Sequence, residues 1–337
     1  MRIGIAGIRS VYWPSAFAEY TRRIPGAELC AAATAGRSEQ EVRESLGMGP
    51  EQFAEKYGVR LYDDPATMAR EERLDAAYVC AEPSRAYELV EALAPLGVHL
   101  YIAKAMANDA AKARRIVDAC ARAGIVTGTG STMRFDAGLR AAHQRIADGE
   151  IGDVYAVRVM HQHGSIDGFP PNDWYWHLEE GGPELSLGWY VLDAVRWLSG
   201  KEVMRIYAEY ENFASSNSPF MDNGKMVMRL TGGAIASTDI YFSTRWPFPR
   251  WEIEVVGSKG SIKTMQTGYE GMLFAKDGIQ AFQHSVNDMV LAELKDWVEA
   301  CRAGRPAAVP VADGLLTLDA CFAAWDAAKT KQPVILR

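Results

Sequence analysis

The sequence lacks closely paired cysteines and long uncharged runs. No CxxC motif occurs among its five cysteines, which are Cys30, Cys80, Cys120, Cys301 and Cys321. Such isolated thiols usually act as small apolar core groups in a reducing cytosol. No uncharged run approaches the roughly 18 residues that span a bilayer, and the opening MRIGIAG is typical of a strand rather than of a secretion signal. We therefore expect a cytoplasmic protein with no membrane partner.

The chain also lacks an excess of positive charge. It has 36 Lys and Arg residues against 43 Asp and Glu residues, which gives a formal net charge of -7. Because nucleic-acid binders usually carry a surplus of phosphate-neutralising side chains, this balance argues against a nucleic-acid partner. A length of 337 residues, with 48% hydrophobic and 23% charged residues, is typical of a globular protein with two domains.

The first part of the chain alternates between short apolar runs and helical patterns. The runs that predict strands are Ile3–Ala6, Glu28–Ala33, Ala76–Ala81, Val98–Ile102 and Ile125–Thr127. Buried strands that are each followed by a helix indicate a parallel sheet covered on both faces. We therefore predict a doubly wound α/β Rossmann domain, which binds a dinucleotide, over residues 1–149.

After Gly152 the pattern changes to strands separated by short turns. Glycine-containing turns such as Thr231–Gly233 and Gly257–Gly260 favour antiparallel hairpins. Helical patterns cover residues 184–198, 286–303 and 313–328. Residues 150–337 are thus predicted to form an α+β domain, in which helices cover one side of a mainly antiparallel sheet.

The turn after the first strand is a degraded phosphate-binding turn. In the pattern G-x-G-x-x-G, the second glycine lets a pyrophosphate approach the backbone. Here Gly7 is followed by Arg9 and Tyr12 at the second and third glycine positions. The turn still joins a strand to a helix, where free N–H groups attract phosphate, so Gly7, Arg9 and Ser10 are candidate cofactor residues. The alternative is an ordinary turn with a solvated arginine.

The end of the second strand has no acidic residue. Proteins that prefer NAD normally place Asp or Glu there, where the carboxylate binds the ribose hydroxyls. The run Ala33–Ser38 instead offers Thr34, Arg37 and Ser38, which can bind a 2′-phosphate. The sequence therefore favours NADP as the cofactor over NAD. The alternative for Arg37 is an exposed residue at a helix start.

Several segments along the chain match the motifs of one enzyme family. Asp75–Pro83 (DAAYVCAEP) is similar to a DAVYIATP strand, and Gly97–Ala105 (GVHLYIAKA) is similar to a GKHVLCEKP segment. Gly181-Gly182 and Gly304-Arg305-Pro306 also fall at landmark positions. Taken together, these segments resemble the Gfo/Idh/MocA family, which includes glucose-fructose oxidoreductase and inositol dehydrogenases.

The resemblance carries its own expectations. It implies that the second domain has an open sheet, through which the protein forms a homo-oligomer (dimer or tetramer), and that Ala81 and Pro83 lie beside the nicotinamide ribose. It implies no metal. His161 and His163 alternate along a strand, but no pattern of acids or cysteines accompanies them, so we predict no metal site.

Two motifs of the family are altered in this chain. Its Glu-Lys-Pro is Ala103–Ala105 here, so that only Lys104 is kept. Its D-x-G-x-H helix motif presents an acid and a base one turn apart; Ser186 takes the acid position and Tyr190 the base position. A tyrosine at that position resembles the glucose-fructose oxidoreductase branch. Asp193 is either a substitute acid or a surface charge.

Hydride transfer needs a side chain that takes or gives the proton of the reacting hydroxyl. We predict that Tyr190 is this catalytic residue and that Lys104 lies beside it. A nearby ammonium favours the phenolate and lowers the pKa of a tyrosine from its reference value of about 10. Lys104 would also contact the cofactor and stabilise negative charge on the substrate oxygen. The alternatives are a core tyrosine and a solvated lysine.

Aromatic residues before the Gly-Gly turn are candidates for substrate binding. Trp174, Trp176 and His177 combine flat apolar rings with polar tips, which suit the faces of a sugar. Ser186 is a further candidate, and Arg134 is expected to shape the cleft between the domains. The alternative is a packed surface loop.

The sequence therefore predicts an NAD(P)-dependent oxidoreductase that moves hydride to or from a sugar, polyol or related small molecule. Two other functions stay open. The altered motifs also suit a regulator that binds nucleotide or sugar without hydride chemistry. An NAD-dependent glycosidase would use the same cofactor for transient oxidation.

Overall fold

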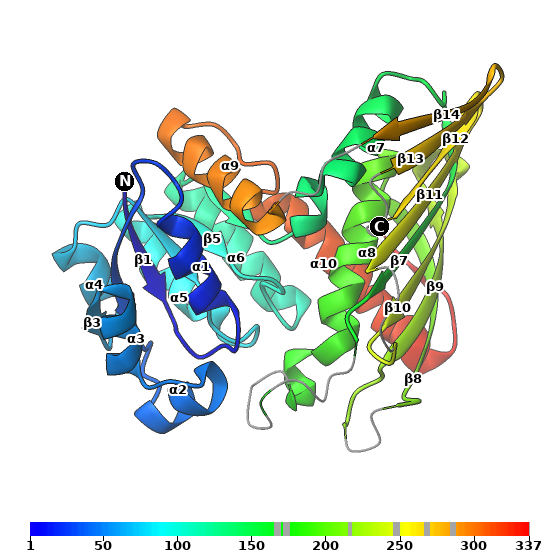
Figure 1. Ribbon diagram of the computed structural model, residues 1–337. Coiled ribbons are helices and arrows are strands. Elements are labelled where there is room, and N and C mark those ends of the chain that lie inside the picture. The colour runs from blue at the N-terminus through cyan, green and yellow to red at the C-terminus, as the bar shows by residue number, and fades with distance from the viewer. Residues whose placement is uncertain are drawn as a thin grey trace. The chain divides into compact units, whose positions relative to one another are not determined.

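The computed structural model describes residues 1–164, 170, 176–214, 218–244, 250–265, 270–283 and 288–336. The chain divides into two compact units. The first comprises Met1–Gly130, Phe169–Gly182 and Val290–Leu315, and the second comprises Ser131–Gly168, Pro183–Met289 and Leu316–Arg337. Each unit contains one β-sheet (Figure 1). None of the described helices is both long enough and apolar enough to cross a membrane.

The sheet of the first unit is parallel throughout, in the strand order β3-β2-β1-β4-β5-β6. Its elements are β1 (Arg2–Ala6), α1 (Trp13–Thr21), β2 (Glu28–Ala33), α2 (Glu39–Leu46), α3 (Pro50–Tyr57), β3 (Arg60–Tyr62), α4 (Pro65–Glu71), β4 (Ala76–Val79), α5 (Ala86–Leu93), η1 (Ala94–Leu96), β5 (His99–Ile102), α6 (Ala110–Ala123) and β6 (Thr127–Thr129). Strand β4 is buried along its whole length, as a strand covered on both faces must be. The strand order is that of a doubly wound sheet, so the predicted Rossmann fold is confirmed.

Two strands of this sheet differ from the prediction. Strand β3 was not predicted, because its three residues, Arg-Leu-Tyr, include no apolar run. Strand β6 begins two residues later than predicted and contains Gly128, which favours no strand by itself. The glycine is needed for packing: a Cβ at Gly128 would lie 2.8 Å from Trp297 Cδ1 and 2.8 Å from Tyr101 Cδ2.

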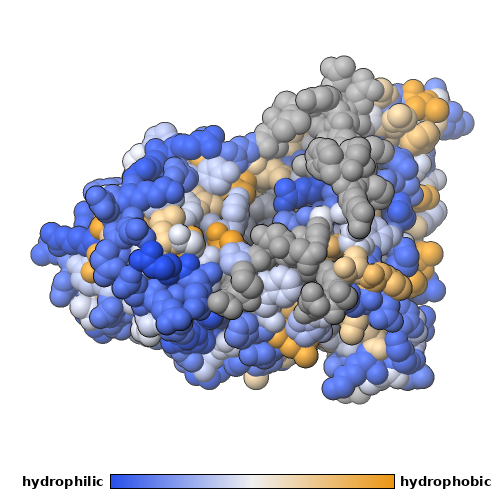
Figure 2. Space-filling view, turned by 60° about the horizontal axis from the view of Figure 1, so that its bottom comes forward, coloured by the Kyte–Doolittle hydropathy of each residue, from blue (hydrophilic) through white to orange (hydrophobic). Residues whose placement is uncertain are grey.

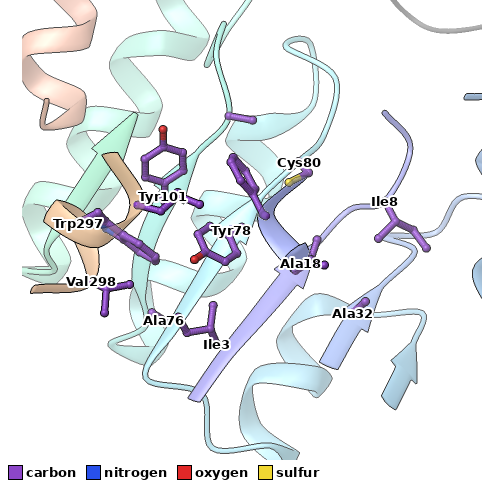
Figure 3. Close-up of a cluster of buried hydrophobic side chains, with 14 of the residues drawn as sticks. Ile3, Ile8, Ala18, Ala32, Ala76, Tyr78, Cys80, Tyr101, Trp297 and Val298 are labelled. Atoms are coloured by element: carbon purple, nitrogen blue, oxygen red, sulfur yellow. The ribbon is translucent and has the colours of Figure 1, made fainter. Parts of the chain in front are cut away.

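Helix α9 (Met289–Ala303) completes the core of the first unit, although it follows the second sheet in the sequence. Trp297 is buried, with its ring centroid 5.2 Å from that of Tyr78 and 5.5 Å from that of Tyr101 (Figure 3). The Tyr78 hydroxyl shares a hydrogen bond of 2.9 Å with Thr21 Oγ1, so its polar tip is satisfied. Burial of such large aromatic side chains makes this cluster a main source of stability for the unit.

The sheet of the second unit is mixed, in the order β14-β13-β12-β11-β7-β10-β9-β8-β15. Its strands are β7 (Val154–Gln162), β8 (Val203–Glu211), β9 (Asn223–Leu230), β10 (Ile235–Tyr241), β11 (Trp251–Gly257), β12 (Gly260–Met265), β13 (Glu270–Ala275), β14 (Gly278–Gln283) and β15 (Val334–Ile335). Strands β7 and β10 pair in parallel, and the other pairs are antiparallel. The predicted mainly antiparallel sheet is confirmed. The parallel pair was missed because short turns reveal only the direction of strands adjacent in sequence.

The second sheet buries one face and exposes the other. Buried and exposed residues alternate along β9, as in a sheet with one solvated face. The helical elements of the unit are η2 (Thr132–Phe135), α7 (Ala137–Ala147), α8 (Gly182–Ser199), η6 (Thr231–Gly233) and α10 (Val311–Thr330), with the ends of α8 and α10 shared with the first unit. The large apolar residues on the exposed sheet face include Val227, Ile235, Val256, Met272, Ile279 and Ile335. The face of the molecule seen in Figure 2 is mainly hydrophilic, with hydrophobic residues in small separate groups.

Candidate functional site

The turn after β1 keeps the geometry of a phosphate-binding turn. Gly7 has a φ of 88°, and a Cβ there would lie 3.3 Å from the backbone of Cys80 and Ala81 at the end of β4. Both the left-handed backbone and the close approach require glycine. Helix α1 follows, and no side chain caps its N-terminus at Tyr12. Pro14 has no N–H, so among the first three residues of this helix only Trp13 and Ser15 can offer a backbone donor to an anionic ligand.

A pocket opens at the carboxyl ends of β1, β2 and β4. Five of the nine predicted cofactor residues line it, namely Gly7, Arg9, Thr34, Arg37 and Ala81, together with Ala35, Cys80, Glu82, Arg85 and Leu89. In doubly wound sheets, the carboxyl ends of the strands are where nucleotides bind. The other four, Ser10, Ser38, Pro83 and Lys104, lie outside this lining. Five residues that the sequence analysis assigned to cofactor binding therefore lie together in one candidate site.

Glu82 was missed by the sequence analysis, yet it lines this pocket and joins two of its arginines. The residue is 2% exposed, and its Oε1 accepts hydrogen bonds from Arg9 Nη1 (2.5 Å) and Arg37 Nη2 (2.6 Å). Arg9 is therefore ion-paired rather than solvated. A signal was present in the sequence, because Glu82 stands where the similar DAVYIATP strand has threonine.

Hydrogen-bond donors in the same pocket are left without partners. The Nε atoms of Arg9 and Arg37 are buried and have no hydrogen-bond partner among the described residues. A buried donor without a partner costs free energy, which a ligand with acceptor oxygens would recover. Phosphate groups of a dinucleotide supply such oxygens, so the residues present fit this class of cofactor.

The residues after β2 are organised by the start of α2. The Ser38 side chain accepts from Glu41 N–H (3.3 Å) and donates to Glu41 Oε2 (2.9 Å), which forms a capping box. Arg37 Nη1 donates to Glu41 Oε1 over 2.8 Å. Thr34 Oγ1 donates to Asp63 Oδ1 over 3.3 Å. The Ser38 hydroxyl therefore serves the helix cap, and Arg37 is held by acids instead of extending into solvent.

Glu180, three residues after the predicted His177, binds the chain just after β4. Trp174, together with Asp173 and Tyr175, lies outside the described residues. The Glu180 carboxylate accepts from Ser84 N–H (2.7 Å) and Ser84 Oγ (2.5 Å), directly after Pro83. Burial raises the pKa of Glu180, although the Ser84 bonds act in the opposite direction.

Two predicted substrate residues, Trp176 and His177, lie directly before η5 (Leu178–Glu180). Trp176 Nε1 is buried and has no partner within the described part of the chain. His177 Nδ1 lies 3.4 Å from Glu179 Oε1, and half of its side chain is exposed. The indole N–H of Trp176 is thus a donor that a ligand hydroxyl could use.

Lys104 follows β5 in the first unit and is only 9% exposed, so the alternative of a solvated lysine is wrong. A Cβ at Gly130 would lie 3.0 Å from Lys104 Cγ, which shows that the glycine makes room for the lysine stem. Long cationic side chains that are buried need acceptors or anions near their ammonium. The buried position is consistent with a functional lysine.

Tyr190 lies in α8 of the second unit and is 8% exposed. Its hydroxyl accepts from Thr132 Oγ1 over 3.3 Å, and its ring stacks on His161 with centroids 5.0 Å apart. Ser186 lies one helical turn earlier and is partly exposed. Since Lys104 and Tyr190 belong to different units, their meeting at a substrate stays a prediction.

Arg134 and Asp193 form a buried ion pair inside the second unit. Arg134 Nε and Nη2 donate to the two oxygens of Asp193 over 2.8 Å and 2.5 Å, and Asp193 also accepts from Ser131 Oγ and from Thr317 Oγ1 (3.3 Å). Asp193 is 0% exposed, so the alternative of a surface charge is wrong. The pair ties η2 to α8 with bidentate geometry.

The histidines on and beside β7 have aromatic neighbours. The His161 ring stacks on Tyr190 and on Trp251, and the His163 ring stacks on Phe242. Among the residues that the structure describes, no group of three or more His, Cys, Asp or Glu side chains is arranged to hold a metal ion.

A doubly wound sheet with a glycine turn and an arginine-lined pocket at its carboxyl edge defines an α/β protein that binds nucleotides. Comparison with known proteins identifies the family to which the chain belongs. Residues 1–131 match the model of the oxidoreductase family with an NAD-binding Rossmann fold, and residues 139–263 match the GFO/IDH/MocA C-terminal domain. The chain therefore belongs to the Gfo/Idh/MocA family of oxidoreductases, and the resemblance noted in the sequence is confirmed.

Individual relatives match over nearly the whole chain. A myo-inositol 2-dehydrogenase from Thermotoga maritima is 26% identical and is matched over 100% of this chain and 98% of its own length. A scyllo-inositol 2-dehydrogenase (NAD(+)) from Bacillus subtilis is 25% identical, over 93% of this chain and 90% of its own. A crystal structure of an oxidoreductase from Agrobacterium radiobacter in complex with NAD+, L-tartaric acid and magnesium shares the fold, with a TM-score of 0.85, 19% identity and coverage of 99% and 98%.

Proposed function

We propose that this protein is an NAD(P)-dependent dehydrogenase or reductase that acts on a CH–OH group of a sugar, polyol or related molecule. The observation that carries the proposal is the pocket at the carboxyl edge of the Rossmann sheet, lined by Gly7 and three arginines. The relatives whose names specify inositol dehydrogenases support the substrate class. The cofactor supplies hydride chemistry when bound.

The cofactor is proposed to be NADP. No acid occurs in Ala33–Ser38, and Arg9, Arg37 and Arg85 line the pocket against a single lining acid, Glu82. This local excess of positive charge favours an additional phosphate. Thr34, Arg37 and Ser38 stay the proposed contacts of the 2′-phosphate, and Gly7, Arg9 and Ser10 those of the pyrophosphate.

Tyr190 and Lys104 are proposed to handle the proton. Tyr190 gives a proton to the substrate oxygen during reduction or takes it during oxidation, and Lys104 stabilises negative charge on that oxygen. The bond from Thr132 helps to fix the position of the Tyr190 hydroxyl oxygen. Ala81 and Pro83 are proposed to lie beside the nicotinamide ribose.

The substrate is proposed to bind through Arg134, Trp174, Trp176, His177 and Ser186. Trp176 is supported by its unpartnered indole N–H. Arg134 would act largely through the helix it holds, because Asp193 engages two of its nitrogens.

The exposed face of the second sheet is proposed to join subunits into a cytoplasmic homo-oligomer. Apolar residues and paired charges alternate on this face: Arg158 lies 3.4 Å from Asp239 and 3.2 Å from Glu252. Such a face suits burial against another copy, since it combines apolar area with hydrogen-bonding groups.

The test is a fluorescence titration with NADH and NADPH, followed by a panel of sugars and polyols monitored at the nicotinamide absorbance. Binding with turnover supports the proposal. Binding without turnover of the panel would instead indicate a regulator, and release of an aglycone from glycosides would indicate a glycosidase. Failure of both nucleotides to bind would refute the cofactor site.

A further inference from the structure

A carboxylate in the lining of the candidate cofactor pocket joins two of its arginines. Glu82 comes from the end of β4, whereas Arg9 comes from the turn after β1 and Arg37 from the turn after β2. One oxygen of Glu82 binds both guanidinium groups, over 2.5 Å and 2.6 Å. The two arginines that would attract phosphate are therefore already joined to an internal anion.

Arg37 is engaged further by a second acid. Its Nη1 donates to Glu41 and its Nη2 donates to Glu82, so each terminal nitrogen already binds a carboxylate. Its Nε is buried and has no partner among the described residues. A phosphate that binds Arg37 must therefore share this guanidinium with two acids, and their negative charge opposes it.

We propose that Glu82 determines the cofactor specificity of this enzyme by holding Arg9 and Arg37, which limits the preference for a 2′-phosphate. The inference rests on the proposed function, because it requires a dinucleotide in this pocket. A nucleotide with a 2′-phosphate must bind Arg37 beside the fixed negative charge of Glu82. A nucleotide with free ribose hydroxyls brings no phosphate to Arg37, and both nucleotides share any competition with Glu82 for Arg9 through the pyrophosphate.

The charge of the cluster gives the sign of the effect. Two arginines and one glutamate carry a net charge of +1, and the substitution Glu82→Gln raises it to +2 with nearly the same side-chain shape. The added positive charge attracts a phosphate dianion and weakens the hold of residue 82 on Arg37, because a neutral amide oxygen accepts less strongly than a carboxylate. We expect the selectivity for the 2′-phosphorylated nucleotide to rise about tenfold, or about 1.4 kcal/mol.

Calorimetric titration of the full chain with two adenosine 5′-diphosphates, one with and one without a 2′-phosphate, measures this selectivity directly, without turnover. The probes are 2′-phospho-5′-ADP and 5′-ADP, and the measured quantity is the ratio of their dissociation constants. Both probes carry the same 5′-diphosphate, so effects on that group cancel in the ratio. Glu91→Gln is the matched control, because it removes the same charge from an Arg115–Glu91 pair on the surface of the same unit; its ratio should stay at the wild-type value.

A second variant covers the case in which Glu82→Gln leaves too much unpaired charge to fold. The double substitution Arg9→Gln, Glu82→Gln keeps the net charge of the cluster at +1 and still removes the carboxylate that binds Arg37 Nη2. Its ratio should also favour the 2′-phosphorylated probe, at least threefold more than wild type does.

The outcomes separate the two proposals. A ratio that is unchanged or lower in the folded Glu82 variants, while both probes bind, overturns the role of Glu82 alone. Failure of both probes to bind the wild-type protein overturns the dinucleotide site itself, and the role of Glu82 with it. A higher ratio in the Glu82 variants, with the Glu91→Gln ratio at the wild-type value, establishes Glu82 as the specificity residue.

Discussion

Removal of the Asp193 carboxylate should cost the second unit several kcal/mol of stability. Asp193 is 0% exposed, and the side chain of its partner Arg134 is 10% exposed. Asp193→Ala leaves the guanidinium buried without its counter-ion, which typically costs about 3–5 kcal/mol. The hydroxyls of Ser131 and Thr317 lose the same acceptor, at about 1 kcal/mol each when counted singly. Because these losses share one site, we expect a total of about 4 kcal/mol rather than their sum.

Equilibrium unfolding in urea, followed by tryptophan fluorescence, measures this loss, since Trp189 and Trp197 lie in the same helix as Asp193. Glu150→Ala is the control: Glu150 pairs with Arg145 over 2.8 Å at a half-buried surface position. Loss of such a pair should cost no more than about 1 kcal/mol.

A double-mutant cycle completes the test. Arg134→Met combined with Asp193→Ala removes both charges, so it should cost about 2 kcal/mol less than the two single losses added together. Additive losses, or an Asp193→Ala loss within about 1 kcal/mol of the Glu150→Ala loss, would refute the argument that the pair is coupled.

Three further predictions follow from single residues. Tyr190→Phe should lower kcat by about 10²–10⁴-fold and leave the NADPH dissociation constant unchanged, because it removes only the proton donor; wild-type turnover would exclude Tyr190 from the chemistry. Burial raises the pKa of Glu184 from 4.5 to about 7. Between these pH values the carboxyl of Glu184 is protonated more often in the folded state than in the unfolded state. The free energy of unfolding should therefore fall as pH rises through this window, by up to about 3 kcal/mol in total. Glu184→Gln should flatten this dependence in urea unfolding at pH 5, 6, 7 and 8, and an unchanged slope would contradict the assignment. Gly128→Ala should cost about 1–3 kcal/mol by overpacking against Trp297 and Tyr101, and a neutral thermal melt would show that these rings can move.

The architecture was predictable because its signals are local. Apolar runs such as Ala76–Val79 and the alternation along Asn223–Leu230 directly report burial on two faces and on one face. Strand β3 carried no such signal, and the parallel pairing of β7 with β10 depends on contacts between distant residues. The sequence of α9 has the pattern of an amphipathic helix. No feature of that segment indicates that Trp297 packs on Tyr78 of the first unit.

Several residues of the candidate site could be predicted from the sequence, but the acids that bind its arginines could not. Gly7, Arg9, Thr34 and Arg37 were all recognised from the pattern around two strand ends, and the structure brings them to one pocket. Glu82 was not recognised, because its interaction with Arg9 joins residues that are 73 positions apart. A pattern that identifies a cation therefore gives no information on whether an acid elsewhere in the chain already binds it.

In both units, arginines that the sequence offers as ligand contacts are already bound to acids of the chain itself, which changes how these arginines can bind a ligand. Arg9, Arg37 and Arg134 each suggest a contact to an anionic or polar ligand when read as isolated cations. In the structure each donates to a buried carboxylate, Glu82 or Asp193, because a buried guanidinium without an acceptor is too costly. An anionic ligand therefore competes with an internal acid for these donors. Affinity then depends on the net charge of each cluster and not on its number of arginines, so neutralising an acid in such a cluster should strengthen anion binding more than adding a surface lysine does.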